Sequence, residues 1–360
     1  MIPLFKVHSP ENVGKVVEEV FASGVVAEGQ QVADFERAFG EKFGNANTVM
    51  VNSGTSALAL AARLLDIGPG TEVVASPMTC FATLAPFFNA GAKFVWADVD
   101  PETGNISAED VADKVTPKTR AVLAVHWGGY PFDYYAVKSA AGRIPIVADA
   151  AHALGAMYEG RPISMLGDYV IFSFQAIKHL TTGDGGALCV RTEEVADRAR
   201  RLRWFGLDRK LKTSTRWEQD LAECGYKYHM NNVAAAIGLA QLPHIDGILA
   251  KHRANSARLD REISNPRVSL LRRDPRVVSS CWVYSLLVDE PKEFGAYLAA
   301  RGIGSDVVHM RNDRYSVFNH FRGGVLPGLD AFASRLWNIP CGWWLSKDDV
   351  MHIIEEVNKW

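Results

Sequence analysis

The sequence predicts an α/β protein with a mixed, mostly parallel sheet that carries helices on both faces, followed by a smaller α+β domain. Short apolar strands alternate with amphipathic helices from residue 48 to residue 202, a pattern that favours parallel strands joined by crossover helices. After residue 245 this alternation gives way to charged helices and isolated strands. We therefore expect a large domain over 10–245 and a small one over 246–360, with residues 1–9 packing on the small domain.

The large domain is expected to begin with two amphipathic helices. Ser9-Pro10-Glu11 is typical of a helix start, because serine caps the helix and proline suits its first turn. A second helix carries Val32 to Phe43. β-Branched and apolar runs predict strands at 48–51, 72–76, 92–99, 119–126, 144–149, 169–174 and 187–190. Further helices are predicted up to Leu65, from Thr79, around Asp110, and at 133–141, 193–202 and 231–242, the last closed by Pro243.

The small domain is predicted to start with a long connecting helix around Ile248. A strand over 277–288, a helix over 291–301 and a final helix over 346–357 are expected to follow. Because no Pro/Ser/Gly linker precedes these elements, the boundary between the domains has no sharp signal in the sequence.

The composition is that of an ordinary globular protein, with 48% of the 360 residues hydrophobic and 22% charged. The net charge of −2 gives no reason to expect a nucleic-acid or membrane partner. Five cysteines without close pairing indicate a reducing compartment and no disulfide framework. There is no apolar signal-peptide core and no uninterrupted apolar run long enough to cross a bilayer. We expect a cytoplasmic protein.

The first candidate for chemistry is Lys178, which lies just past the buried strand predicted at 169–174. A polar, Gly-rich turn follows that strand, so the ammonium group can be partly removed from water. Desolvation lowers the pKa of a lysine and makes its amine a usable nucleophile. Most lysines on loops simply contact solvent, so the interpretation depends on the residues found elsewhere.

The second candidate is Asn52-Ser53-Gly54-Thr55, between a strand and a helix. The free N–H groups of a helix start can hold a phosphate, and Gly54 would let the backbone approach it. An ordinary helix cap explains the same residues. The stretch matches neither the Walker A loop nor the dinucleotide fingerprint.

The third candidate is Asp149, which closes an apolar strand and is followed by small residues that leave space for a flat ligand. A carboxylate there can keep a heteroaromatic nitrogen protonated, although capping of a following helix is an equal alternative. Ser173 could donate to a phosphate or bond the backbone. Taken together, the lysine, the aspartate and the phosphate cradle fit pyridoxal 5′-phosphate.

Five stretches then resemble the sugar aminotransferase family of the DegT type, within the fold type I pyridoxal phosphate enzymes. They cover most of residues 10–245 and read Asn52-Ser-Gly-Thr-Ser-Ala-Leu58, Asp149-Ala-Ala-His-Ala-Leu-Gly155, Phe172-Ser-Phe-Gln-Ala-Ile-Lys178, Gly183-Asp-Gly-Gly186 and Gly225-Tyr-Lys-Tyr-His-Met-Asn231.

The resemblance implies a role for each matched residue. Lys178 matches the lysine that forms the Schiff base and moves the proton in catalysis, and Asp149 matches the partner of the pyridine nitrogen. The phosphate ligands match Gly54, Thr55 and Ser173. His229 lies where the family sends a polar side chain into the neighbouring subunit's site, which implies a homodimer with active sites at the subunit interface.

Three positions depart from the family's usual pattern. His152 stands where many members carry glutamine near the phenolic oxygen of the cofactor. Cys80 stands where an aromatic side chain commonly stacks on the cofactor ring, and the adjacent Phe81 is expected to point elsewhere. His229 replaces an asparagine or arginine, so its phosphate contact is expected to depend on pH.

The resemblance implies amino transfer from glutamate to a nucleotide-linked keto sugar, in the biosynthesis of lipopolysaccharide, other surface polysaccharides or secondary-metabolite sugars. A sugar dehydratase is one alternative, but in this family it goes with a histidine in place of Lys178. A non-catalytic regulator that retains the fold is the other. Three aromatic and basic clusters could hold a nucleotide diphosphate or be core aromatics beside surface arginines: 127–130, 203–209 and 309–315.

Overall fold

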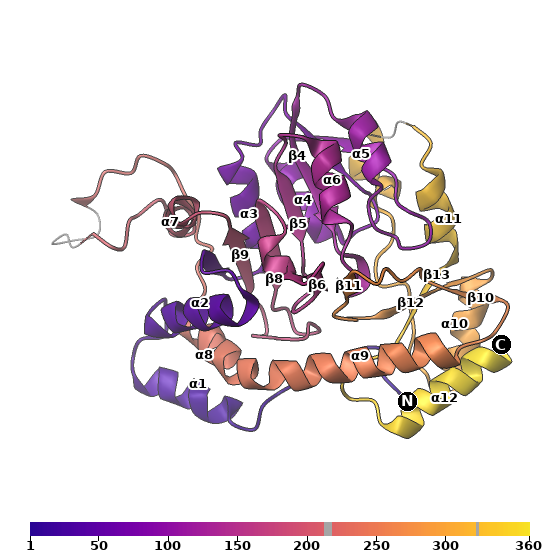
Figure 1. Cartoon of the computed structure of the whole chain (residues 1–360). Helices are drawn as coiled ribbons and strands as arrows, with labels where there is room; N and C mark the ends of the chain where they lie inside the picture. Colours follow the sequence, from indigo (N-terminus) through magenta and orange to yellow (C-terminus); the bar gives the residue numbers. More distant parts are fainter. Residues whose placement is uncertain (212–217, 322–323) are drawn as a thin grey trace.

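The computed structural model of the chain describes residues 1–211, 218–321 and 324–360, and its central element is a seven-stranded sheet (Figure 1). The strand order is β1-β9-β8-β5-β4-β2-β3. Strand β9 runs antiparallel to β1 and β8, and the other neighbours are parallel. The predicted mixed, mostly parallel sheet is therefore confirmed. Its strands are β1 (Thr48–Val51), β2 (Glu72–Ala75), β3 (Lys93–Trp96), β4 (Thr119–Val125), β5 (Ile146–Asp149), β8 (Tyr169–Ser173) and β9 (Gly186–Val190).

Helices cover both faces of this sheet, as predicted. Alternation along β1 shows why: Met50 belongs to one buried apolar cluster, while Val49 and Val51 belong to the other. Side chains from α2 (Gln30–Phe43), α5 (Ala108–Lys114), α6 (Tyr134–Ala141) and α8 (Asn232–Gln241) complete the first cluster. Those from α3 (Gly54–Leu64), α4 (Phe81–Asn89) and α7 (Glu193–Leu202) complete the second.

The first helix starts later than its sequence signal indicates. Helix α1 (Val13–Ala22) is preceded by Asn12 at the cap position, and a turn in which the Val13 N–H donates to the Pro10 carbonyl comes before it. The prediction of a start at Ser9 is therefore wrong by one turn, because Pro10 initiates that turn and not the helix.

The C-terminal part has a three-stranded antiparallel sheet of β10 (Val268–Leu270), β12 (Tyr284–Val288) and β13 (Leu336–Ile339). Helices α10 (Pro291–Ala299) and α12 (Lys347–Lys359) contribute with it to a third apolar cluster, whereas the buried residues of α11 (Pro327–Arg335) belong to the second cluster. At the other end of the chain, the Ile2 N–H donates to the Gly302 carbonyl. The division into domains at residue 245 stays a prediction.

The predicted strand over 277–288 is two separate strands. Its first part, β11 (Val277–Val278), pairs with β6 (Met157–Tyr158), which in turn pairs with β7 (Arg161–Pro162). Residues 279–283 leave the strand direction, and Cys281 adopts a left-handed conformation with φ of 53°. The single-strand prediction is wrong, and this loop carries a residue of the site described below.

Pro243 ends α8 as predicted, but the helical rod continues. A 3-10 turn (Leu242–His244) accommodates the proline, and α9 (Ile245–Glu262) follows directly along the lower side of the molecule (Figure 1). By length and mean hydropathy the rod, residues 232–262, is the one helix of the described chain that could cross a membrane, and 56% of its most apolar window is buried inside the protein. The sequence analysis predicted no membrane-spanning run because polar and charged residues interrupt the apolar residues along this rod. Burial of this extent is typical of a core helix.

Candidate active site

A cavity of about 320 Å³ opens beyond the carboxyl ends of the parallel strands. Three strands end in its wall, β4 with Val125, β5 with Asp149 and β8 with Ser173. This edge is where ligands bind in open α/β sheets. The predicted site residues in the wall are Gly54, Thr55, Cys80, Asp149, His152, Ser173 and Lys178. The structure therefore brings together every predicted site residue except His229.

Lys178 lies in a turn just after β8, where its backbone N–H donates to the Gln175 carbonyl at 2.9 Å. The surrounding protein lowers the pKa of Lys178 to about 8, because burial disfavours the ammonium form. The negative charge of Asp149 partly opposes this effect. A substantial neutral fraction at mild pH is what an amine nucleophile needs.

Asp149 is buried and accepts two hydrogen bonds within its own chain. The Thr83 hydroxyl donates to it at 2.7 Å and the Ala151 N–H at 3.0 Å. Thr83 in turn accepts from the Thr79 hydroxyl at 2.8 Å. Burial raises the pKa of Asp149, while these hydrogen bonds and the Lys178 ammonium lower it. Turns follow β5, so the alternative that Asp149 caps a helix does not hold.

The start of α3 provides both a cap and free donors. Ser53 is the capping residue: its hydroxyl accepts from the Ser56 N–H at 3.0 Å, and its carbonyl accepts from the Ala57 N–H. The N–H groups of Gly54 and Thr55 precede the intrahelical ladder and face the cavity end of the helix. These two donors suit an anion.

Glycine is required at this helix start because β8 and β9 approach it closely. A Cβ atom on Gly54 would lie 3.0 Å from the Ser173 Cβ, and one on Gly186 would lie 2.5 Å from the Gly54 nitrogen. The motif glycines therefore let the helix N-terminus and the Ser173 hydroxyl converge on one point.

Trp282, which the sequence analysis missed, and His309, which it named only as a member of the 309–315 cluster, complete the wall beside His152. The rings of His152 and Trp282 stack with centroids 3.8 Å apart. The Nε2 atoms of His152 and His309 lie 3.3 Å apart, so one donates to the other. Burial lowers the pKa of both histidines, that of His309 to about 3, so both rings are neutral near pH 7.

Cys80 occupies the cap position of α4 and lines the cavity, where burial raises its pKa and keeps the thiol neutral. The adjacent Phe81 points away, with its ring packed against Tyr315 and Phe318. Because residue 80 is a cysteine and not an aromatic residue, any face-on contact with a bound ring must come from other residues of the wall.

His229 lies outside the cavity of its own chain. Its backbone pairs with Val51 at the end of β1, and its ring packs edge-on against Trp204 at 3.8 Å. Burial lowers the pKa of His229 to about 4 in these surroundings. Its role toward the site of a second subunit stays a prediction.

The aromatic and basic clusters mostly serve the core. Trp127 is buried, and Arg203 is held by ion pairs with Glu28 and Glu36. Arg311 is paired with Asp313, among other partners. His309 is the member of these clusters that lines the cavity.

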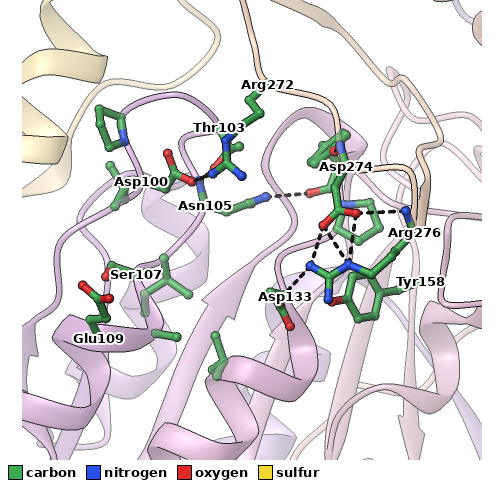
Figure 2. Close-up of a pocket in the computed structure, with 17 residues that line it drawn as sticks. Asp100, Thr103, Asn105, Ser107, Glu109, Asp133, Tyr158, Arg272, Asp274 and Arg276 are labelled. Atoms are coloured by element: carbon green, nitrogen blue, oxygen red, sulfur yellow. Dashed lines mark hydrogen bonds and ion pairs between the residues drawn. The ribbon is translucent and has the colours of Figure 1, made fainter.

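A second cavity of about 430 Å³ lies near the 99–109 loop and residues 272–276 (Figure 2). Its arginines are neutralised by neighbouring carboxylates: Arg272 pairs with Asp100, and Arg276 pairs with Asp133 and Asp274. Because its described lining residues include no lysine or cysteine and no unpaired cation, we place the chemistry in the cavity around Lys178.

The residues around Lys178 fit pyridoxal phosphate. Besides the amine, the carboxylate and the free helix N–H groups, the Nδ1 atom of His152 is buried without a hydrogen-bond partner in the described residues. An unpaired buried polar atom is costly, so it indicates a missing ligand. The volume also lies in the range of small-molecule sites.

Comparisons with known proteins agree with this assignment. The model of the DegT/DnrJ/EryC1/StrS aminotransferase family matches residues 9–358. The fold is similar to AtS13 from Actinomadura melliaura, with a TM-score of 0.96, 40% identity, and coverage of 100% of this chain and 99% of that one. It is also similar to the sugar aminotransferase CalS13 from Micromonospora echinospora, with a TM-score of 0.96, 38% identity and full coverage of both chains. The Bacillus subtilis spore coat polysaccharide biosynthesis protein SpsC is 33% identical over 95% of this chain and 92% of its own.

Fold and site together define a pyridoxal phosphate-dependent enzyme of fold type I. The match over nearly the whole chain then identifies the family: the protein belongs to the DegT/DnrJ/EryC1/StrS aminotransferases. Its cofactor is pyridoxal 5′-phosphate, and its reaction is amino transfer.

Proposed function

We propose that the protein transfers an amino group from glutamate to a keto sugar carried by a nucleotide. The observation that carries the proposal is the single cavity in which the Lys178 amine, the Asp149 carboxylate and the free N–H groups of α3 meet. The similarity to the sugar aminotransferase CalS13 supports a sugar as the acceptor.

The bound cofactor would supply an electron sink for the substrate carbon that exchanges its amino group. Lys178 would hold the cofactor covalently through its Nζ atom, and once the donor frees this amine it would move the proton between the substrate carbon and the cofactor carbon as general base and acid. A pKa of about 8 leaves the amine partly neutral near physiological pH, as a general base requires. Asp149 holds the proton on the pyridine nitrogen, because its carboxylate favours the charged ring.

Other residues of the wall orient the cofactor. The N–H groups of Gly54 and Thr55 and the hydroxyl of Ser173 would hold its phosphate. His152 would offer its unpaired Nδ1 to the cofactor's phenolic oxygen, and Cys80 would border the ring.

We further propose a homodimer in which His229 reaches the phosphate in the partner's site. The position of His229 outside its own cavity supports this arrangement. We place the enzyme in the cytoplasm, in the biosynthesis of lipopolysaccharide, other surface polysaccharides or secondary-metabolite sugars. The name of SpsC supports the polysaccharide setting.

The test follows the visible absorbance of the purified, cofactor-loaded protein. Glutamate should abolish the visible band, and a keto sugar nucleotide from a panel should restore it. Mass spectrometry should find a product in which an amine replaces the carbonyl oxygen. A product that has lost water would instead establish the dehydratase, and a protein without the band or any product would be a regulator. The presence of Lys178 argues against both alternatives.

A further inference from the structure

The loop between β11 and β12, residues 279–283, closes over the amine of Lys178. Two hydrogen bonds hold its backbone to the turn that follows β4. The Ser280 and Trp282 N–H groups donate to the carbonyls of Gly129 and Gly128, both at 3.0 Å. The Ser280 hydroxyl also donates to the His152 carbonyl at 2.6 Å. The loop is therefore a fixed part of the site.

Trp282 makes two separate contacts with the Lys178 segment. The Nζ atom of Lys178 lies 3.7 Å from a ring centroid of Trp282, which is a close cation–π contact. The indole N–H donates to the carbonyl of Ile177, the residue directly before the lysine, at 2.9 Å. One side chain thus contacts the amine and the backbone that carries it.

The indole itself is held on several sides. Its ring stacks on Phe5 with centroids 4.8 Å apart and on His152 at 3.8 Å, and Trp282 is only 2% exposed. The left-handed turn at Cys281 that aims the ring is fixed by hydrogen bonds from the Cys281 N–H to the Ser279 hydroxyl and from His252 to the Cys281 carbonyl. A ring so constrained offers a fixed surface.

We propose that Trp282 is a positioning residue for Lys178, whose ammonium rests on the indole face whenever the amine is not bound to the cofactor. The N–H bond to Ile177 keeps the backbone in place, so that the amine returns along one path. The proposal rests on the assignment of Lys178 to the cofactor. Peptide mapping after borohydride reduction tests that assignment separately, so the failure of one is distinguishable from the failure of the other.

Several titratable groups also face Lys178. In the described chain these are Asp149, Cys80, His152, His179 and His309. Burial keeps the three histidines neutral and raises the pKa of the thiol, so Asp149 and the indole face are the groups that favour the ammonium. Loss of the aromatic face should therefore lower the pKa of Lys178.

The test uses the full-length enzyme loaded with pyridoxamine phosphate, in which Lys178 is a free amine. Acetic anhydride labelling of Lys178, followed by mass spectrometry across a pH series, gives the midpoint of its titration. Trp282→Phe keeps an aromatic face and Trp282→Leu does not. We expect the Leu midpoint to lie about 0.5 to 1.5 units below the Phe midpoint.

Trp343→Leu is the matched control, because Trp343 has its own cation–π partner, Lys6, away from the cavity. It should leave the Lys178 midpoint unchanged. Water entering the cavity would raise the midpoint in both Trp282 variants, so equal midpoints for Phe and Leu would overturn the proposal. If the Trp282 variants do not fold, Phe5→Leu loosens the indole alone and should lower the midpoint by a smaller amount; an unchanged midpoint there would overturn the proposal as well.

Discussion

At the scale of single residues, Lys178 is predicted to be the covalent attachment point of the cofactor. Borohydride reduction of the loaded enzyme should fix the cofactor to this residue. In the cofactor-free protein, the rate of covalent capture should rise with pH and level off above about pH 8, because only the neutral amine attacks. Mass-spectrometric mapping to another lysine, or a rate that keeps rising toward the ordinary lysine pKa, would contradict the assignment.

Asp149→Asn should keep the fold and bind the cofactor, but turnover should fall by about 100-fold or more. The change is nearly isosteric, and the amide oxygen can keep the hydrogen bond from the Ala151 N–H, while the amide nitrogen takes the place of the oxygen that accepts from Thr83. The negative charge that holds the pyridine proton is lost. Circular dichroism and cofactor absorbance serve as controls for folding and binding, and a variant as active as the parent protein would show that Asp149 has no electronic role.

Thr83→Val tests the support of that carboxylate. The hydrogen bond from Thr83 lowers the pKa of Asp149, so its removal raises this pKa and protonates the carboxylate at a higher pH. The acid limb of the pH–rate profile should therefore move to higher pH, with a smaller loss of activity at its plateau than in Asp149→Asn. Thr79 is one hydrogen bond further from the carboxylate, so Thr79→Val should move the acid limb of the profile less. An unchanged acid limb in Thr83→Val speaks against this coupling.

Lys178, Asp149, Ser173, Gly54 and Thr55 could be proposed from the sequence because each lies at the end of a strand or the start of a helix. Local patterns predict such places, and the parallel sheet brings them to one edge. Thr83, Trp282 and His309 enter the cavity through tertiary packing, and the sequence analysis named His309 only as part of the 309–315 cluster. For Thr83 a signal was available, since it lies within the Met78-Thr-Cys-Phe-Ala-Thr83 stretch beside Cys80.

At the scale of elements, Arg203, the residue directly after α7, connects α7 to α2, to the segment before α2 and to β1. It is 4% exposed and pairs with Glu36 on α2 and with Glu28, and it donates to the Met50 carbonyl on β1 at 2.7 Å. Its charge is thus fully compensated. Removal of the guanidinium would take from both carboxylates their most buried cationic partner, leaving Glu28 with the more exposed Arg209 and Glu36 with the more distant Arg200.

Arg203→Met should therefore lower the free energy of unfolding by about 3 kcal/mol, because two buried ion pairs lose the partner that they share. Arg37→Met is the control, since Arg37 pairs with Asp34 on the same helix with 63% of its side chain exposed. That surface pair should change stability by less than about 1 kcal/mol. Denaturant unfolding measures both, and equal effects would show that the Arg203 network contributes no more than a surface pair.

Elements were predicted well where one periodicity extends over their whole length, as in β1 and α7, whose bounds match the prediction. The prediction for the 277–288 segment failed because only Ser279 and Ser280 interrupt the apolar residues before Cys281, and hydrophobicity alone does not mark a left-handed residue. Pro243 was read as a stop, yet a 3-10 turn carries the rod past it. In both places the tertiary contacts of the chain override the local signal.

At the scale of the whole molecule, the site depends on segments from distant parts of the sequence. Lys178 and Asp149 come from the large sheet, while Trp282 and His309 come from beyond α9. His229 is the predicted site residue that does not join them. Its backbone lies beside the end of β1 while its ring turns to Trp204, outside the cavity. A second subunit is the simplest way for this residue to act on a cofactor.

Subunit mixing tests this arrangement. Lys178→Ala chains are expected to be inactive, and His229→Ala chains to be impaired in cofactor binding. If His229 acts across the interface, a heterodimer of the two holds one site with both lesions and one with neither. Activity should then reappear, up to about half that of the native sites, given the isologous symmetry expected of such a dimer. Native mass spectrometry should confirm the mixed dimers. Mixed dimers without activity would show that His229 does not act in trans, and an active monomer at working concentration would rule out a shared site altogether.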